Sequence, residues 1–170
     1  MKKILLALLS FLVGVVIFMP KEQLYYSALR YLQKERVSIK ADAVRDRLFW
    51  LEIKGAKIYY DGIESIDAKE IKIKPWLFYN SVVIEEAKSA DELRGVMELN
   101  AKSVELTHSL LNYKSLFLRA DGSFGKASGK IDLFARDINI TLQPSNSFKE
   151  SQLSGYFRKS KEGWRYDTKF

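Results

Sequence analysis

The first element that the hydrophobic pattern predicts is an apolar helix at the start of the chain. From Ile4 to Met19 there is no charged residue, and Pro20 would end the helix there. At about 1.5 Å per residue the run reaches roughly 24 Å, a little short of the ~30 Å hydrocarbon core of a bilayer. A cleavable signal peptide needs small residues before its cleavage site, and the end of this run has none. We therefore expect residues 1–20 to form an uncleaved signal anchor rather than a cleaved signal peptide.

The charges beside the apolar run bear on its orientation. Two basic residues precede it, Lys2 and Lys3, and four follow, Lys21, Arg30, Lys34 and Arg36. The positive-inside rule applied to this count alone would place the main domain in the cytoplasm. A very short basic tail followed at once by an apolar segment is instead typical of an export signal. We expect the N-terminus in the cytoplasm and the main domain on the other side of the membrane.

A second helix is predicted directly after the run, over residues 21–36. Leu24, Ala28, Tyr31 and Leu32 recur at helical spacing, with polar residues between them. This amphipathic helix could lie on the membrane surface, where tyrosines favour headgroup depth. It could equally cover one end of the following domain.

Beyond Val37 the apolar period changes from helical to two, which predicts a succession of strands. The dipeptides Asp61-Gly62, Asp121-Gly122 and Glu162-Gly163 are hairpin-type turns. A helical turn is expected near 90–93, and a short helix or wide loop at 107–114. The expected strands are 37–43, 48–53, 56–60, 66–74, 82–87, 95–106, 115–120, 129–142, 153–159 and 164–170.

Several of these strands alternate apolar with charged residues, which is typical of antiparallel strands with one buried and one solvated face. The alternation changes phase near Glu70 and between Ala135 and Ile138, and such slips indicate bulges that bend a sheet. The predicted fold is mainly β: a transmembrane helix (1–20), a juxtamembrane amphipathic helix (21–36) and a curved antiparallel sheet (37–170), shaped as an open barrel or groove.

Composition narrows the class of protein. A chain of 170 residues has room for one such domain, and without cysteine it has no disulfides, thiolate metal sites or cysteine nucleophiles. The net charge is +7, but six basic and two acidic residues lie in residues 1–36, so +4 of it sits beside the predicted membrane segment. Basic residues there would meet anionic headgroups. We expect no nucleic-acid partner.

The sequence contains few residues in arrangements that catalysis uses. His108 is the single histidine and has no second histidine or cysteine to share a metal. The adjacent carboxylates Glu85-Glu86 and Asp91-Glu92 do not converge, because neighbours on a strand point to opposite faces. The glycine-rich text GSFGKASGK lacks the ending of a phosphate loop and is interpreted as a bent hairpin. We expect no catalytic residue, no metal and no cofactor, and hence no enzyme.

One group of aromatic residues remains as a candidate contact site: Phe49, Trp50, Trp76, Phe78 and Tyr79. In one interpretation they fill the core where the sheet bends. In the other they line an apolar groove open at one edge, suited to an acyl chain or to a partner strand added at the sheet edge.

A resemblance to known proteins lies in three segments of the chain: RLFWLEIKGAKIYYDG, IESIDAKEIKIKPWLFYNSVVIEEAKSADELRGVMELN and the closing LQPSNSFKESQLSGYFRKSKEGWRYDTKF. Following a short anchor, they resemble the type II secretion system protein N family and the wider AsmA-like group. The matching positions, which are turns and apolar alternation, are Ala68, Ile71, Ile73, Pro75, Leu77 and Gly95.

The resemblance implies an inner-membrane-anchored periplasmic β-domain without catalytic residues to carry over. The first hypothesis is an accessory or assembly component of a type II secretion system, with secretion or envelope proteins as partners. The second is a module that binds or transports lipid, similar to the single-span β proteins of lipopolysaccharide export, in which the sheet shields acyl chains. A plain scaffold is the third.

Overall fold

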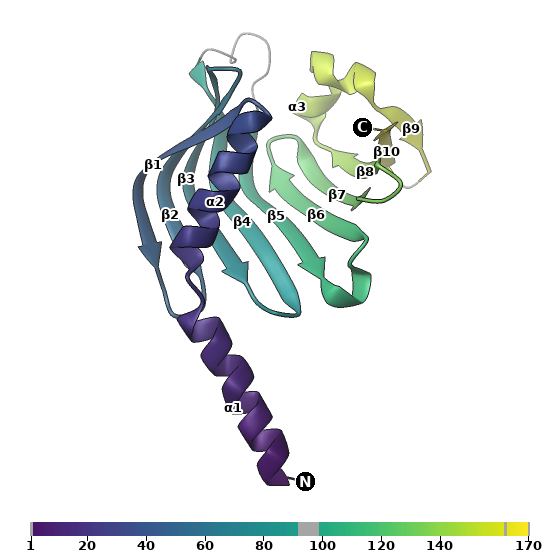
Figure 1. Cartoon of the computed structure of the whole chain (residues 1–170). Helices are drawn as coiled ribbons and strands as arrows, with labels where there is room; N and C mark the ends of the chain where they lie inside the picture. The colour runs from purple at the N-terminus through teal and green to yellow at the C-terminus, as the bar shows by residue number, and fades with distance from the viewer. Residues whose placement is uncertain (1, 92–98, 162, 170) are drawn as a thin grey trace.

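The chain folds as an open antiparallel β-sheet preceded by two helices (Figure 1). The computed structural model describes residues 2–91, 99–161 and 163–169. Within them, ten strands form one sheet and three α-helices accompany it. The mainly β, antiparallel class predicted from the alternation is confirmed.

The helices and strands follow one another in a simple order. They are α1 (Lys2–Phe18), α2 (Lys21–Lys34), β1 (Val37–Asp46), β2 (Leu51–Tyr60), β3 (Ile63–Pro75), β4 (Tyr79–Ser89), β5 (Asn100–Ser109), the 3-10 helix η2 (Leu110–Asn112), β6 (Ser115–Gly122), β7 (Gly125–Asp132), β8 (Asp137–Pro144), α3 (Asn146–Lys149), the 3-10 helix η3 (Gln152–Tyr156), β9 (Arg158–Ser160) and β10 (Gly163–Lys169).

The sheet is a meander in which each strand from β1 to β8 pairs with the next, and β10 then lies between β8 and β9. Turns therefore alternate between two ends of the sheet. The turns β1–β2, β3–β4, β5–β6 and β7–β8 lie at the end where α1 joins the domain, called here the α1 end (Figure 1). The turns β2–β3 and β6–β7 lie at the opposite, far end.

The strand register aligns apolar residues in rows that cross the whole sheet. One row consists of Val44, Ile53, Ile71, Ile84, Val104, Ala120, Ala127, Leu142 and Trp164, paired successively from β1 to β10. Because side chains in a row point to one side, these residues define an apolar face. The opposite side carries most of the charged strand residues and is called the polar face.

The helix α2 covers the apolar face at its β1 side, where the core lies. Tyr25 packs in a buried cluster with Leu51, Ile53 and Ile71, and Leu29 lies against it. Three residues of the predicted apolar stripe, Leu24, Ala28 and Tyr31, are instead exposed, and of that stripe only Leu32 is half-buried. The helix has apolar residues on two sides, and the side that contains Tyr25 and Leu29 packs against the sheet. This contact supports the covering role for α2.

The phase change predicted near Glu70 coincides with an irregular backbone conformation but not with a shift in strand register. The pairs Lys54–Glu70 and Ala56–Ala68 keep one register on either side of Gly55, which has φ +57°, and the register shift between β2 and β3 lies at Ile58 and Tyr59. The same discontinuity recurs in β4, where Glu86 has φ +50°. The alternation of apolar and polar residues shifts by one position at Gly55 and Glu86. Because of this shift, the apolar residues lie on the same face of the sheet on both sides of the bend.

Two strand predictions are wrong. The expected strand 129–142 is two strands, and its phase slip near Ala135 is the turn between β7 and β8 rather than a bulge. The expected strand 153–159 is η3 followed by the short β9. Here β10 takes the place beside β8, so residues 145–157 cross over the sheet, and only the short β9 pairs, with the outer side of β10. The second half of the predicted 90–93 turn and the first four residues of the predicted 95–106 strand fall outside the described residues.

No single helix among the described residues is long and apolar enough to cross a membrane. Together α1 and α2 meet the criteria of length and composition, but they are bent by 57° at the break between them. The transmembrane helix is therefore not confirmed and stays a prediction.

Candidate functional site

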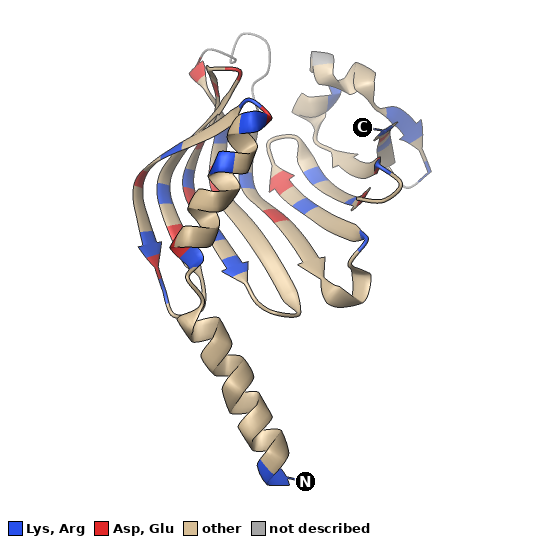
Figure 2. Cartoon of the chain, in the orientation of Figure 1, with Lys and Arg blue, Asp and Glu red and all other residues tan. Residues whose placement is uncertain are grey.

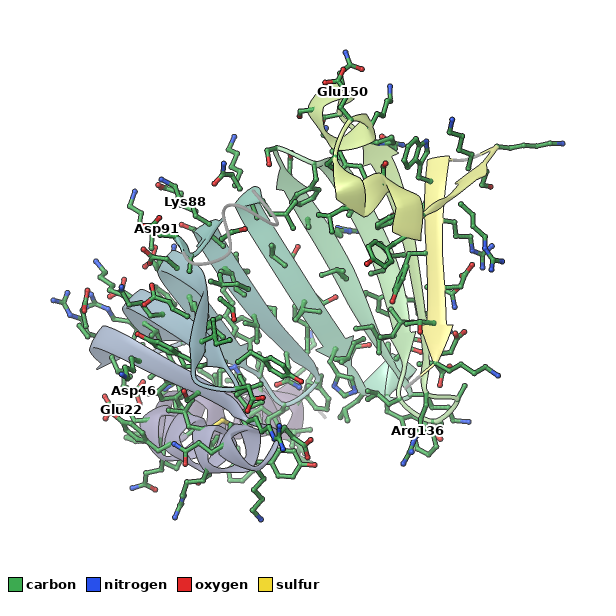
Figure 3. All side chains as sticks on the ribbon, turned by 90° about the horizontal axis from the view of Figure 1, so that it is seen from above. Glu22, Asp46, Lys88, Asp91, Arg136 and Glu150 are labelled. Atoms are coloured by element: carbon green, nitrogen blue, oxygen red, sulfur yellow. The ribbon has the colours of Figure 1, made fainter. Side chains whose placement is uncertain are left out.

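A second cover lies over the apolar face at its C-terminal side and encloses a cleft. Figure 3 shows α2 beside β1 and the helical segment with Glu150 beside the last strands. The cleft under this segment has a volume of about 420 Å³, within the range of about 300–1,000 Å³ common for small-ligand sites. Its lining is almost entirely carbon: Leu99, Leu118, Ala120, Phe124, Ala127, Ile140, Leu142, Phe148, Leu153, Tyr156, Phe157 and Tyr166.

The cover is held in place by a capped helix and an aromatic cluster. The Ser145 hydroxyl accepts a hydrogen bond from the Phe148 backbone N–H at 3.1 Å and so begins α3. Phe148 is buried and meets Phe157 edge-on, with ring centroids 5.5 Å apart, and Trp164 at 6.2 Å. Phe157 in turn contacts Tyr166 at 5.7 Å.

The floor of the cleft is the sheet itself, where Ala120 and Ala127 stand between larger neighbours. Their short side chains leave the space that the cleft occupies. Sequence reasoning did not single out any cleft residue, although the density of aromatic residues from Phe148 to Tyr166 was a usable signal. The residues come from six elements and the segments between them, and they converge only through the fold of the sheet and its cover.

Between the two covers the apolar face continues through the middle strands. Val82 and Ile84 on β4 and Val104 and Leu106 on β5 are each half-buried. Leu106 pairs with Leu118, a cleft residue, so the middle strands join the cleft without a polar interruption. The apolar face is thus continuous from the α2 core to the cleft.

The aromatic residues predicted as a contact site lie elsewhere, in the turns at the α1 end. Phe49, Trp76, Phe78 and Tyr79 are all exposed. The Trp76 indole Nε1 donates a hydrogen bond to the Phe49 carbonyl oxygen at 3.0 Å, and the two rings are 6.4 Å apart. This pair ties the β1–β2 turn to the β3–β4 turn.

Trp50 is half-buried beside this pair, and its indole Nε1 is buried without a hydrogen-bond partner. Tyr79 borders a hollow of about 820 Å³ on the polar face, whose lining includes Glu105, Arg119 and Lys130. That hollow is larger than the apolar cleft but is edged by solvated charges. None of the five predicted aromatic residues lines the apolar cleft.

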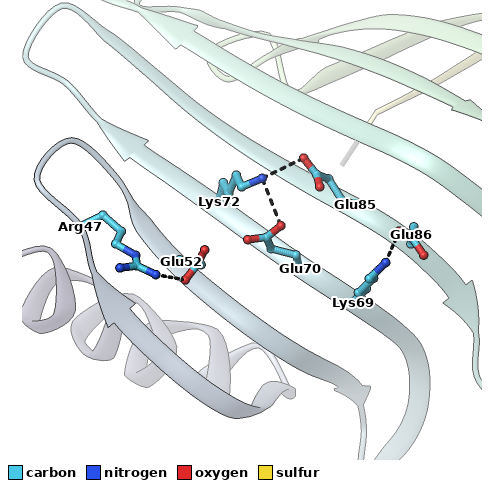
Figure 4. A network of polar contacts seen from close by, with 7 residues as sticks. All are labelled: Arg47, Glu52, Lys69, Glu70, Lys72, Glu85 and Glu86. Carbon is cyan, nitrogen blue, oxygen red and sulfur yellow. Dashed lines mark hydrogen bonds and ion pairs between the residues drawn. The ribbon is translucent and has the colours of Figure 1, made fainter.

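Ion pairs lie on β2, β3 and β4, and two of them, Lys72–Glu85 and Lys69–Glu86, cross from β3 to β4 (Figure 4). The Arg47 guanidinium donates to the buried Glu52 carboxylate at 3.0 Å and holds the pKa of that carboxyl below its ordinary value of 4.5. Hydrogen bonds to Glu70 and Glu85, each at 3.1 Å, raise the pKa of the Lys72 amine. Each carboxylate here has a cationic partner, which is the arrangement of a structural network.

The other titratable residues considered in the sequence, His108 and Glu86, also have partners within the chain. The His108 ring Nε2 lies 3.1 Å from the Tyr113 carbonyl oxygen. Glu86 pairs with Lys69 rather than with its neighbour Glu85. Among the residues that the structure describes, no cluster of three or more histidine, aspartate or glutamate side chains could hold a metal ion.

No protein-family model, curated protein or solved structure matches this chain. The class is therefore defined by the fold and the site alone: an open antiparallel sheet with an N-terminal helix pair and an apolar cleft.

Proposed function

We propose that this protein is a non-enzymatic, membrane-anchored binding protein of the cell envelope that holds a lipid acyl chain in its apolar cleft. The carbon lining of the cleft carries the proposal, because such a surface offers an apolar ligand burial and offers a polar ligand no partners. The tyrosines Tyr156 and Tyr166 are the lining residues with polar side-chain groups.

The helix α1 supports the anchoring part of the proposal. It has no buried residue, although nearly all its side chains are apolar. An apolar helix with no buried side chain in the described part of the chain fits a hydrocarbon environment better than water. With the N-terminus in the cytoplasm, the sheet would stand in the periplasm of a double-membraned bacterium, at the inner membrane.

Binding of cis-parinaric acid, a fluorescent fatty acid, to the detergent-purified full chain tests the proposal. We expect a saturable rise in fluorescence, weakened at least tenfold in an Ala127→Phe variant because the added ring fills the cleft. Ser128→Phe is the matched control, since it adds the same ring to the same strand on the opposite, polar face.

Lipid extraction of the purified chain followed by mass spectrometry provides an independent readout. Absence of both co-purifying lipid and parinaric acid binding would refute the proposal. Equal weakening by Ala127→Phe and Ser128→Phe would place the bound chain outside the cleft. Circular dichroism of both variants checks that the sheet is intact.

A role in the assembly of a secretion system is the second candidate, favoured by the edge of the sheet. Strand β1 has ten residues and pairs with β2 on one side, and no described strand pairs with its other side. A long edge strand can add a partner strand by backbone hydrogen bonds. A photo-crosslinker at the exposed Arg45 should then capture a secretion protein in cells, whereas capture of lipid alone would dismiss this candidate.

A further inference from the structure

We propose that the four turns at the α1 end form a docking surface for the bilayer interface, so that the sheet stands on the membrane by its rim. Each turn presents a large apolar side chain to solvent. Leu48, Phe78, Leu111 and Phe134, one from each turn, are 62, 60, 94 and 69 % exposed. These four turns are called the apolar rim.

The rim is continuous with the apolar helix α1. Phe18 ends α1, and Lys21 begins α2. The Lys21 ammonium forms an ion pair at 2.9 Å with Asp46, the last residue of β1 and two residues before Leu48. This buried lysine fixes the end of α1 against the first turn of the rim. A bilayer that received α1 would therefore meet the rim as well.

The residue types of the rim fit the interfacial region of a bilayer. Trp76 and Tyr113, both exposed, join the leucine and phenylalanine side chains there. Rings with one polar atom prefer headgroup depth, and leucine and phenylalanine prefer the adjoining hydrocarbon. Figure 2 shows α1 free of charged residues apart from the lysines at its N-terminal end, and between Pro75 and Tyr79 the β3–β4 turn has no charged residue.

The charges that do lie at the rim suit an anionic membrane surface. Lys74, Lys114 and Arg136 form no ion pair with another described residue. The Lys114 ammonium lies 5.6 Å from the centres of the Tyr113 and Phe134 rings, with the amine beside the apolar side chains. The acidic groups nearby already have partners. Asp46 pairs with Lys21 and Glu52 with Arg47, Asp132 accepts from the backbone N–H groups of Phe134 and Ala135, and Asp137 accepts from the Asn139 side-chain amide.

The absence of cysteine from the chain allows a direct test by spin labelling. Leu111→Cys and Phe134→Cys place a nitroxide on the rim, and Ile63→Cys places one at the far end as the matched control, on a side chain that is also exposed. Leu9→Cys reports on α1. The full chain is reconstituted into vesicles of phosphatidylethanolamine with one quarter phosphatidylglycerol, and collision with oxygen is compared with collision with a water-soluble nickel chelate.

We expect the oxygen-to-nickel ratio at Leu111→Cys and Phe134→Cys to exceed that at Ile63→Cys several-fold. Equal ratios at all three positions would overturn the docking proposal. Rim labels shielded from both reagents, with spin–spin broadening that grows with protein density, would assign the rim to a second copy and overturn it too.

The docking inference rests on the proposed function, because it takes α1 to be the membrane anchor. The Leu9→Cys label distinguishes a failure of docking from a failure of the anchor. A label in lipid at Leu9→Cys with water-exposed rim labels would leave the anchor standing and remove the docking surface. Rim labels in lipid with a water-exposed Leu9→Cys label would support docking and refute the anchor.

Discussion

Gly55 shows how one residue sets the bend of the sheet. Its φ of +57° lies in the left-handed region, which costs other residues about 1–2 kcal/mol. A Cβ at this position would also overlap the Asp42 carboxylate on the neighbouring strand. Both constraints favour glycine at the point where β1 and β2 change phase.

We therefore expect Gly55→Ala to lower the free energy of unfolding by more than the roughly 1–2 kcal/mol of backbone strain alone. Gly62→Ala is the control, because Gly62 has φ +84° in the β2–β3 turn but open space around its Cβ position. Urea unfolding followed by circular dichroism compares the two. Equal losses would show that the contact with Asp42 is unimportant.

The carboxyl of Glu52 couples stability to acid. Its pKa is lowered in the folded chain, mainly by the hydrogen bond from Arg47. Its contribution is therefore present above the ordinary value of 4.5 and is lost as the pH falls through the lower folded value. We expect Glu52→Gln to be less stable than the parent at neutral pH and to lose less stability between neutral pH and acid.

Urea midpoints measured from neutral pH down to acid test this expectation. Glu35→Gln is the control, since Glu35 is exposed and makes no ion pair with a described residue. A Glu52→Gln profile parallel to the parent profile at all pH values would contradict the assigned role.

At the scale of elements, the cover made by α3 and η3 depends on Phe148. This ring is the buried residue of α3 and contacts both Phe157 and Trp164. Truncation of a buried phenylalanine commonly costs about 3–5 kcal/mol. We expect Phe148→Ala to release the cover, which would raise protease cleavage at residues 145–157 and weaken parinaric acid binding.

Phe134→Ala serves as its control, because that ring is exposed in the β7–β8 turn. Limited proteolysis with mass mapping separates local release of the cover from global unfolding. Cleavage spread evenly over the sheet would mean that Phe148 stabilises the whole domain rather than the cover.

The elements also show what the sequence could predict. Local signals were sufficient for the Asp61-Gly62 turn, where Asp61 and Gly62 both have positive φ, and for the phase change near Glu70, but not for the register shift at Ile58 and Tyr59. The cover was not predictable from alternation, because Leu153 and Phe157 have a strand-like spacing but pack onto strands distant in sequence. Phe49 and Trp76 both belong to the predicted aromatic group, but their contact with each other and their place in the turns follow from the meander.

At the scale of the whole molecule, the apolar face links the rim to the cleft. On β6, Leu116 lies nearest the rim, and Leu118 and Ala120 follow as cleft residues. Leu116 pairs with Ile131 on β7, which continues the apolar surface across the sheet. If the rim rests on the bilayer, an acyl chain could reach the cleft along this surface without crossing a charged residue of the same face.

A charge on this route should block it. In a background with Trp50→Phe and Trp76→Phe, Trp164 beside the cleft is the single tryptophan, and lipid with brominated chains should quench it in reconstituted vesicles. We expect Leu116→Glu to reduce this quenching, because a carboxylate on the apolar face costs desolvation as a chain passes. Phe117→Glu carries the same charge on the polar face of the same strand and should leave the quenching unchanged. Quenching that persists in Leu116→Glu would mean that lipid reaches the cleft by another path, and equal loss in both variants would point to a disturbed β6 rather than a blocked route.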